Sequence, residues 1–341
     1  MRRLSTLLAV AAILVSGCGG TTSTSDTPDH PSALALNGPA TARVASEDVR
    51  PVATSAPVLP VTVRSNDGAT VTVSHVDRIV AVDLYGTLGE IVFSLGLGDR
   101  VVGRDSSTGF PSAAEVPVVT SGGHDLNAES IMDLDPDVVL TDTSVGPPEV
   151  PQQLRSAGIP VIFFEPSRTV DGVEAQIMAV ATALGVPAAG EELVERVDEE
   201  ITTARALAPA GTAAPRIAFL YVRGSAGVYL LAGPGSGADS IISAVGGVDV
   251  GTDIGLDKPF VPITSEALLN AQPDVIMVMT KGLQSIGGVD GLLRIPGIGQ
   301  TPAAHHRRII DIADTDLLSF GPRVGETITA LATVLYRADE Q

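Results

Sequence analysis

Two segments of this chain repeat one another at a fixed spacing, and that repeat limits the possible fold more than any other feature. The run from Asn127 to Asp137 reads Asn-Ala-Glu-Ser-Ile-Met-Asp-Leu-Asp-Pro-Asp, and the run from Thr264 to Asp274 reads Thr-Ser-Glu-Ala-Leu-Leu-Asn-Ala-Gln-Pro-Asp. The helix dipole favours a glutamate in a first turn, and a proline before a strand ends the helix. Helix capping therefore explains each copy alone. It does not explain the matched spacing, which predicts two lobes built alike.

Short apolar runs rich in β-branched residues alternate with helical stretches on both sides of the chain. The runs begin at Arg78, Val101, Asp137, Pro160, Arg216, Asp274 and Arg308. Buried strands separated by helices are typical of mostly parallel sheets. The expected fold class is α/β, with two Rossmann-like lobes and a ligand cleft between them.

One long helix is predicted to join the lobes. Apolar residues at helical spacing run from Leu193 to Leu207, after a break at Gly185-Val-Pro187, and a helix over 188–207 would span about 30 Å. This places the N-terminal lobe at residues 58–168, connecting helices at 169–210 and the C-terminal lobe at 211–341. Asn66-Asp-Gly68, between two alternating runs, predicts a hairpin at the start of the first lobe.

The first 57 residues resemble an export signal followed by a tether. Arg2 and Arg3 precede an apolar stretch of roughly 14 residues, too short for a membrane span, and Cys18 follows Val15-Ser-Gly17. Residues 1–17 are expected to be a signal peptide, and the Thr-, Ser-, Pro- and Ala-rich residues 18–57 a flexible tether. The pattern at Cys18 resembles a lipobox, which implies a lipid anchor on that sulfur. The alternative is an ordinary signal with an incidental cysteine.

Composition excludes some classes of function. The chain carries 40 acidic against 21 basic residues, without a long basic run, so a nucleic acid is not an expected partner. Neither a Gly-x-Ser-x-Gly elbow nor a His-Glu-x-x-His zinc helix occurs in the sequence. We therefore do not expect an enzyme.

Two candidate metal-binding side chains follow predicted strands, where cleft residues of open α/β sheets lie. His124 follows the strand-like Val116–Val119, and Tyr221 closes the first strand of the second lobe, two residues before Arg223. Histidine and tyrosine both serve as axial ligands of haem iron, and a nearby guanidinium favours the phenolate. The alternatives are an exposed loop histidine and a tyrosine at the edge of the core.

These features together resemble the helix-backbone, class III substrate-binding proteins of ABC importers, which serve haem, ferric siderophores and cobalamin. The resemblance covers the chain from about Pro60 to its end. It implies export to the outer face of the cytoplasmic membrane, a permease and an ATPase as partners, and Glu129 and Glu266 as the permease-docking residues. Helix capping is the alternative for both glutamates.

Within that class the chain looks most like the haem-receptor lipoproteins of Gram-positive haem-uptake systems. The segments that carry this likeness are His124 before Leu126-Asn-Ala-Glu129, and Tyr221-Val-Arg-Gly224 before Tyr229. The resemblance implies haem b as the transported ligand, His124 and Tyr221 on its iron, Arg223 holding the Tyr221 oxygen, and haem-donor proteins upstream. Tyr229 is the rival ligand, and a siderophore or cobalamin receptor is the alternative function.

Four further residues carry expectations. Phe260 stands where relatives often have a tyrosine, so it is expected to stack on the porphyrin. Tyr85 either lines the pocket or only packs, and Met279 either contacts the ring or fills the core. Arg323, at the start of the last predicted helix, is expected to be an ordinary surface charge.

Overall fold

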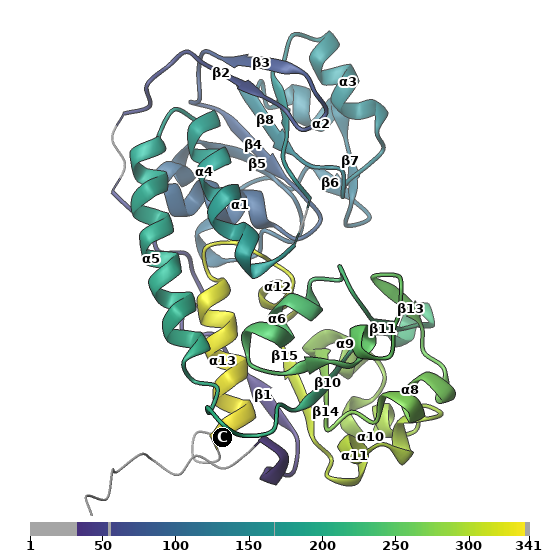
Figure 1. The fold of residues 1–341 in the computed structure, drawn as a ribbon. Coiled ribbons are helices and arrows are strands. Elements are labelled where there is room, and N and C mark those ends of the chain that lie inside the picture. The colour runs from purple at the N-terminus through teal and green to yellow at the C-terminus, as the bar shows by residue number, and fades with distance from the viewer. Residues whose placement is uncertain (1–32, 54–55, 167, 338–341) are drawn as a thin grey trace, which may run out of the picture.

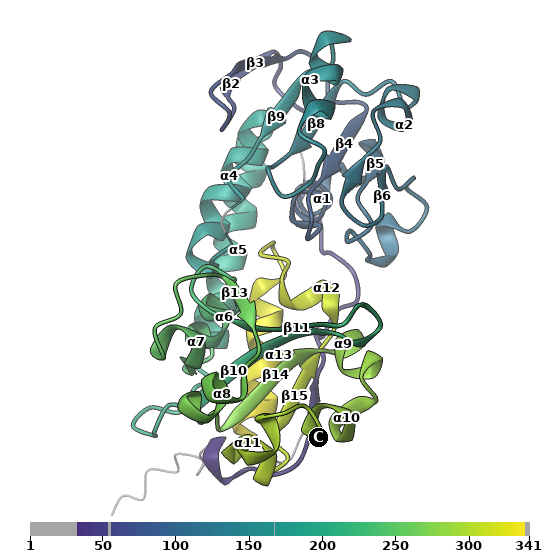
Figure 2. The same cartoon turned by 90° about the vertical axis from the view of Figure 1, so that its right-hand side faces the viewer.

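The computed structural model describes residues 33–53, 56–166 and 168–337. It shows two α/β lobes stacked along one long helix, α5 (Pro187–Arg205), as Figures 1 and 2 show from two sides. The expected signal peptide and Cys18 lie outside the described residues. In the part of the chain that is described, no helix combines the length and apolarity that a bilayer span needs.

The first lobe is built on a parallel sheet of order β5-β4-β8-β9. Every residue of its two central strands is buried, which is why both read as continuous apolar runs. The predicted hairpin is present as β2 (Val61–Arg64) and β3 (Thr70–Val73). The remaining elements of the lobe are β4 (Ile79–Val82), β5 (Val101–Arg104), β6 (Thr120–Ser121), β7 (Asp125–Leu126), β8 (Val138–Thr141), β9 (Val161–Phe163), α1 (Thr87–Val92), α2 (Ala128–Asp133) and α3 (Glu149–Ser156).

The second lobe contains a mixed sheet. Its parallel part has the order β1-β15-β14-β10, with antiparallel β11 and β13 beyond β10 and the short β12 alongside β10. Its strands are β1 (Ala40–Ala42), β10 (Arg216–Arg223), β11 (Val228–Ala232), β12 (Val248–Asp249), β13 (Phe260–Pro262), β14 (Val275–Met279) and β15 (Ile309–Ile312). Its helices are α6 (Ala238–Ala244), α7 (Val250–Asp253), α8 (Ser265–Ala271), α9 (Thr280–Ser285), α10 (Gly288–Leu293), α11 (Pro302–His305), α12 (Asp314–Leu317) and α13 (Val324–Tyr336).

The sequence repeat is a structural repeat, beginning with the caps of α2 and α8. Asn127 Oδ1 accepts from the Ser130 amide at 2.9 Å, and Thr264 Oγ1 accepts from the Ala267 amide at 3.1 Å. Side chains outside the glutamates thus cap both helices. Each helix is followed, one residue before its Pro-Asp pair, by a non-glycine residue with positive φ, at 44° for Asp135 and 42° for Gln272.

The same arginine contact closes each copy of the repeat. Arg78 Nε donates to the Leu134 carbonyl at 2.9 Å, and Arg216 Nε donates to the Ala271 carbonyl at 3.1 Å. Both carbonyls belong to the ends of the repeated helices, where carbonyl groups lack partners within the helix. The two helices are therefore held against their sheets in equivalent ways.

The predicted tether is wrong for residues 33–53, which belong to the folded body. Ala40–Ala42 form β1 and pair in parallel with β15 of the second lobe. Farther along, the Asp48 carboxylate accepts from the Ser112 hydroxyl of the first lobe at 2.6 Å. Composition indicated a tether, but an unpaired edge of β15 would expose its hydrogen-bonding groups, and β1 covers that edge.

The lobes share one apolar core as well as the long helix. α4 (Val173–Ala183) and α13 pack against α5, and a single cluster of buried side chains runs from Leu88 in the first lobe through Ile177 and Leu193 to Ile328 in α13. The junction is thus a continuous packed surface rather than one helix alone.

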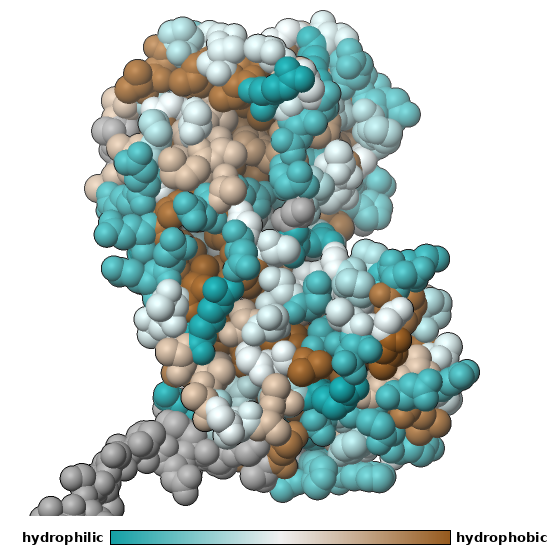
Figure 3. All heavy atoms as spheres, in the orientation of Figure 1, coloured by the Kyte–Doolittle hydropathy of each residue, from teal (hydrophilic) through white to brown (hydrophobic). Residues whose placement is uncertain are grey.

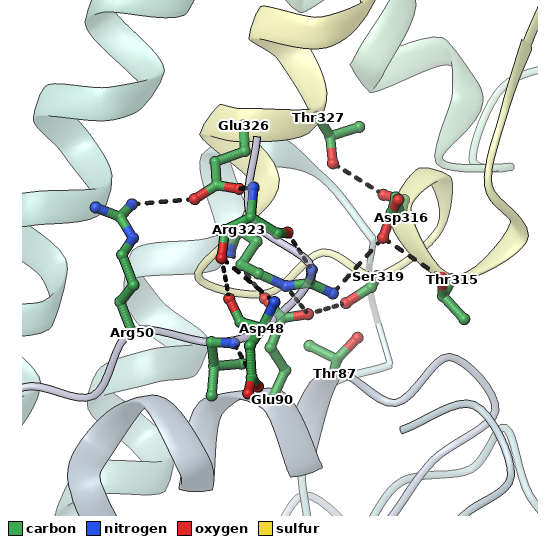
Figure 4. Close-up of polar contacts among 12 residues, drawn as sticks. Asp48, Arg50, Thr87, Glu90, Thr315, Asp316, Ser319, Arg323, Glu326 and Thr327 are labelled. Carbon is green, nitrogen blue, oxygen red and sulfur yellow. Dashed lines mark hydrogen bonds and ion pairs between the residues drawn. The ribbon is translucent and has the colours of Figure 1, made fainter. Parts of the chain in front are cut away.

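A buried polar contact also crosses the junction, between α1 and the loop before α13 (Figure 4). The carboxylate of Glu90, 2 % exposed, accepts from the Ser319 hydroxyl at 2.7 Å and from the Arg323 amide at 2.8 Å. The Arg323 guanidinium lies 3.7 Å from Glu90 and 3.6 Å from Asp316. Burial raises the pKa of Glu90, and the Arg323 charge opposes that rise. The prediction that Arg323 is a surface charge is wrong, because carboxylates from both lobes surround it.

We predict that Arg323→Ala lowers the free energy of unfolding by about 3–5 kcal/mol, since it leaves a buried carboxylate without its cation. The loss should be smaller at pH 5 than at pH 8. Without Arg323 the pKa of Glu90 rises further above that of the unfolded chain, so the folded form binds the proton more tightly. The contribution of this proton binding to the free energy of unfolding is fully present below about pH 4.3, the ordinary pKa of a glutamate. It is lost as the pH rises through the pKa of Glu90 in the folded variant.

Urea denaturation at the two pH values measures both effects. The control is Arg50→Ala, whose ion pairs with Glu200 and Glu326 involve an arginine side chain that is 53 % exposed. That variant should lose about 1 kcal/mol or less. An Arg323→Ala variant no less stable than Arg50→Ala would contradict the prediction.

Candidate functional site

A cavity of about 510 Å³ opens between the lobes. The space-filling view shows the molecule narrowing there, with a notch on the side away from α5 (Figure 3). Residues of both lobes line the cavity: Leu84, Tyr85, Ser106, Ser107, Gly122, Gly123, His124, Tyr221, Arg223, Leu230, Phe260, Met279, Lys281, Asp314, Thr315 and Leu318. It thus gathers six of the seven residues that the sequence analysis proposed for the ligand.

The second lobe supplies its part of the wall from strand ends. Tyr221 and Arg223 lie two residues apart at the carboxyl end of β10, so their side chains share a face of the strand. Met279 ends the neighbouring strand β14, and its side chain is only 2 % exposed. Parallel strands direct their carboxyl ends to one edge of the sheet, and here that edge faces the first lobe.

His124 reaches the cavity from the turn between β6 and β7. Gly122 and Gly123 adopt positive φ values of 60° and 92°, which allow this tight turn, while Val118 makes only an isolated bridge instead of the predicted strand. The imidazole is 59 % exposed, and its Nδ1 lies 3.1 Å from the Asp125 carboxylate. With a proton on Nδ1, the unprotonated Nε2 has a lone pair that can bind a metal, which is the arrangement common in metal-binding histidines.

Tyr221 is held by an aromatic and a cationic neighbour. Its ring meets Phe260 edge to face at 6.0 Å between centroids, and the Arg223 guanidinium lies 4.7 Å over the ring. Arg223 does not donate to the Tyr221 oxygen here. Its Nη2 instead pairs with Asp314 Oδ1 at 2.7 Å. The resemblance had implied a contact to the oxygen, and the structure shows stacking on the ring.

Asp314 and Lys281 are cavity residues that the sequence analysis missed. Asp314 Oδ2 accepts from the Lys281 amide at 3.0 Å, so this carboxylate links the first turn of α9, directly after β14, to Arg223. The Lys281 ammonium has no ion pair among the described residues. Nothing in the local sequence could have indicated Asp314, because 91 residues separate it from its arginine.

Tyr85 lines the opposite wall as a neutral phenol. The guanidinium of Arg168 lies 3.9 Å over its ring. Burial raises the pKa of Tyr85, and Arg168 only partly opposes that rise. The raised pKa makes Tyr85 poorly suited to act as a phenolate.

The turn that presents Tyr85 rests on a buried carboxylate. Asp83 accepts from the amides of Tyr85 at 2.8 Å and Leu88 at 2.7 Å. Burial, together with the nearby charges of Asp105 and Asp142, raises the pKa of Asp83 to about 8. No sequence signal marks this group, because each of the three buried aspartates directly follows a different strand and looks like an ordinary residue at a strand end.

The structure separates Tyr229 from the cavity. Along β11 its neighbour Leu230 lines the cavity, whereas Tyr229 points to the other face and lines a depression with Ile263 and Arg294. The prediction of Tyr229 as a rival ligand and cleft residue does not fit this position.

Glu129 and Glu266 lie outside the cavity, on α2 and α8 of different lobes (Figure 1). Both are exposed, and neither forms an ion pair with a described residue. Since Asn127 and Thr264 already cap these helices, capping does not require the glutamates.

The cavity suits a metal that arrives inside a chelate. Among the described residues, no three His, Cys, Asp or Glu side chains gather around a point where a bare ion could bind. One imidazole and one phenol from opposite lobes can instead occupy the two axial positions of an iron whose equatorial positions are already filled. The apolar walls can cover the faces of a flat ring.

Several solved structures resemble this one. HmuT, described as a heme binding protein, matches with a TM-score of 0.83 and 38 % sequence identity over 90 % of this chain and 100 % of its own. The heme-binding protein RhuT from Roseiflexus sp. RS-1 matches with a TM-score of 0.72 and 42 % identity over 77 % of this chain and 98 % of its own.

Curated proteins are also similar to this chain. The ABC transporter substrate-binding lipoprotein YvrC of Bacillus subtilis is 26 % identical over 82 % of this chain and 86 % of its own length. A cobalamin-binding protein of Halobacterium salinarum is 29 % identical over 60 % of this chain and about half of its own, 54 %. A family profile described as periplasmic binding protein matches residues 80–315, and this chain therefore belongs to the periplasmic binding protein family.

Proposed function

We propose that this protein captures an iron porphyrin between its lobes and delivers it to an ABC importer. The observation that carries the proposal is that His124 and Tyr221 reach one cavity from opposite lobes. Each supplies a donor atom that haem iron accepts, and Phe260, Leu230 and Leu318 supply apolar wall. The transported ligand is haem b, and Met279 and Tyr85 contact its ring.

Two properties of the solved relatives support this reading. HmuT and RhuT are both described as heme-binding. Matching structures also include HmuT variants in which alanine replaces one histidine, one tyrosine, or an arginine two residues after that tyrosine. The same residue types occur here in the same order, with the same tyrosine-to-arginine spacing.

Cobalamin is the second candidate, because the Halobacterium relative is described as cobalamin-binding. A cobalamin or a ferric siderophore carries much or all of its metal coordination itself, so neither requires an imidazole and a phenol facing one another. The His124 and Tyr221 pair therefore favours haem.

We further propose an anchored receptor with a membrane partner. Cys18 carries a lipid that holds the protein on the outer face of the cytoplasmic membrane, where haem-donor proteins supply the ligand. Glu129 and Glu266, one on each lobe, dock on the permease, whose ATPase drives import. The protein itself has no catalytic role.

Our first prediction here concerns the ligand. The chain from residue 33 onward should bind one haemin, with a saturable Soret shift and a spectrum of six-coordinate iron with His and tyrosinate ligands. A titration followed by absorbance and by electron paramagnetic resonance checks this. Cyanocobalamin is the comparison ligand. If the protein bound cyanocobalamin more tightly than haemin, cobalamin rather than haem would be the transported ligand.

The second prediction separates the two donors. Tyr221→Phe removes the anionic ligand of ferric iron and should weaken haemin binding by at least about tenfold, whereas His124→Ala should leave a five-coordinate tyrosinate complex. Tyr229→Phe is the matched control, because that side chain faces away from the cavity. A spectral change in Tyr229→Phe with none in Tyr221→Phe would reverse the assignment.

The third prediction concerns docking. Glu129→Gln with Glu266→Gln should leave haemin binding and the melting temperature nearly unchanged and remove haem-stimulated ATPase activity of the importer. Side-chain charges at a rim mainly steer encounter, so added salt should reduce the difference from the native protein. If the glutamates only stabilised the helices, the double variant would have a lower melting temperature. Its free energy of unfolding would fall by about 1 kcal/mol per helix at most, and ATPase stimulation would be retained.

A further inference from the structure

Large apolar side chains are exposed at five positions of the described chain, and two of these positions are equivalent. The five are Leu34, Val58, Val118, Met132 and Leu269. Met132 is 38 % exposed and Leu269 is 44 % exposed. Each follows the proposed docking glutamate of its lobe by three residues. A single exposed apolar residue is ordinary on a protein surface, but this pair occurs at matched positions of the repeat.

Helix geometry places each apolar residue beside its glutamate. Residues three apart lie on the same side of a helix, so Glu129 is next to Met132 on α2, and Glu266 is next to Leu269 on α8. The opposite side of each helix is anchored in the core by Ile131 and Leu268, both 0 % exposed. Both helices therefore turn a carboxylate and an apolar side chain outward.

The backbone fixes both helices in the same pose. Their caps, the positive φ after each helix and the Arg78 and Arg216 contacts to the helix ends recur in the two lobes. The lobes themselves are locked together through the Glu90 and Arg323 contact and the shared core. The two patches are thus presented at a fixed separation, without induced folding.

The chemistry of the patches defines a complementary partner. An unpaired carboxylate fits a guanidinium or ammonium group. Burying the neighbouring apolar side chain adds a favourable contribution that does not depend on salt. Because the pattern occurs twice, the partner must offer the same pair of features twice.

We propose that Glu129 with Met132, and Glu266 with Leu269, form two equivalent docking patches for a membrane permease made of two like subunits. Each subunit supplies a cationic side chain beside an apolar socket. The proposal rests on the proposed function as an importer's binding protein. It adds to that function an apolar contact that supplies much of the binding free energy, with the glutamates setting encounter and register.

The test uses the haem-loaded protein and the importer complex of the same organism reconstituted in nanodiscs. Met132→Ser with Leu269→Ser should weaken binding to the importer by at least about tenfold at both low and high salt. Glu129→Gln with Glu266→Gln should weaken it mainly at low salt. The two single serine variants should each weaken binding to the importer, and by factors similar to one another. The matched control is Val58→Ser, which changes an apolar residue that is 75 % exposed and lies outside both patches.

Each outcome separates this proposal from the proposed function. Haemin binding and melting temperature are measured on every variant, so loss of the fold or of the ligand site is recognised directly. If the serine double variant binds the importer as tightly as the native protein while the glutamine double variant does not, the apolar patches are wrong and glutamate docking stands. If only one serine variant has an effect, the two patches are not equivalent. If the native protein does not bind haemin, the proposed function as a haem receptor is wrong, whatever the importer-binding results.

Discussion

The buried carboxylate of Glu90 is the contact on which the geometry between the lobes depends. It belongs to α1 of the first lobe and is satisfied by Ser319 and Arg323 of the second. The same short segment carries Asp314 and Thr315, which line the cavity, and Asp316, which approaches Arg323 (Figure 4). One loop therefore forms both the joint and part of the cavity wall. A shift of the joint would move the cavity wall as well, because the intervening residues are few and well packed.

The cavity lining carries one ion pair and one lysine that has no carboxylate partner among the described residues. Asp314 offsets Arg223, whose guanidinium lies over the Tyr221 ring. The pairing leaves Lys281 as the lining cation without a carboxylate partner among the described residues, and it faces the same space. A ligand with peripheral carboxylates, as haem has, would meet a charge of the opposite sign at Lys281.

The two lobes also share the features that a partner would contact. Their outward helices have the same caps, the same backbone turn and the same arginine contact, so their surfaces repeat together with their folds. The continuous core along α4, α5 and α13 limits how far one lobe can turn against the other. A two-subunit partner would therefore meet a preformed pair of patches, and little ordering free energy would oppose docking.

The sequence alone determined what local patterns encode. Buried strands appear as apolar runs, α5 appears as a helical period, and the repeat at Glu129 and Glu266 shows the duplicated lobes. The end of a predicted strand located Tyr221 at the cleft, whereas His124 reaches it from the turn between β6 and β7 rather than from the strand expected at Val116–Val119. Tertiary structure decided the rest, because no local pattern records a partner distant in the chain. Only the fold pairs Glu90 with Arg323, 233 residues later, and Arg223 with Asp314. It also recruits Ala40–Ala42 to an open sheet edge, and the pleat of β11 turns Tyr229 away from the cavity.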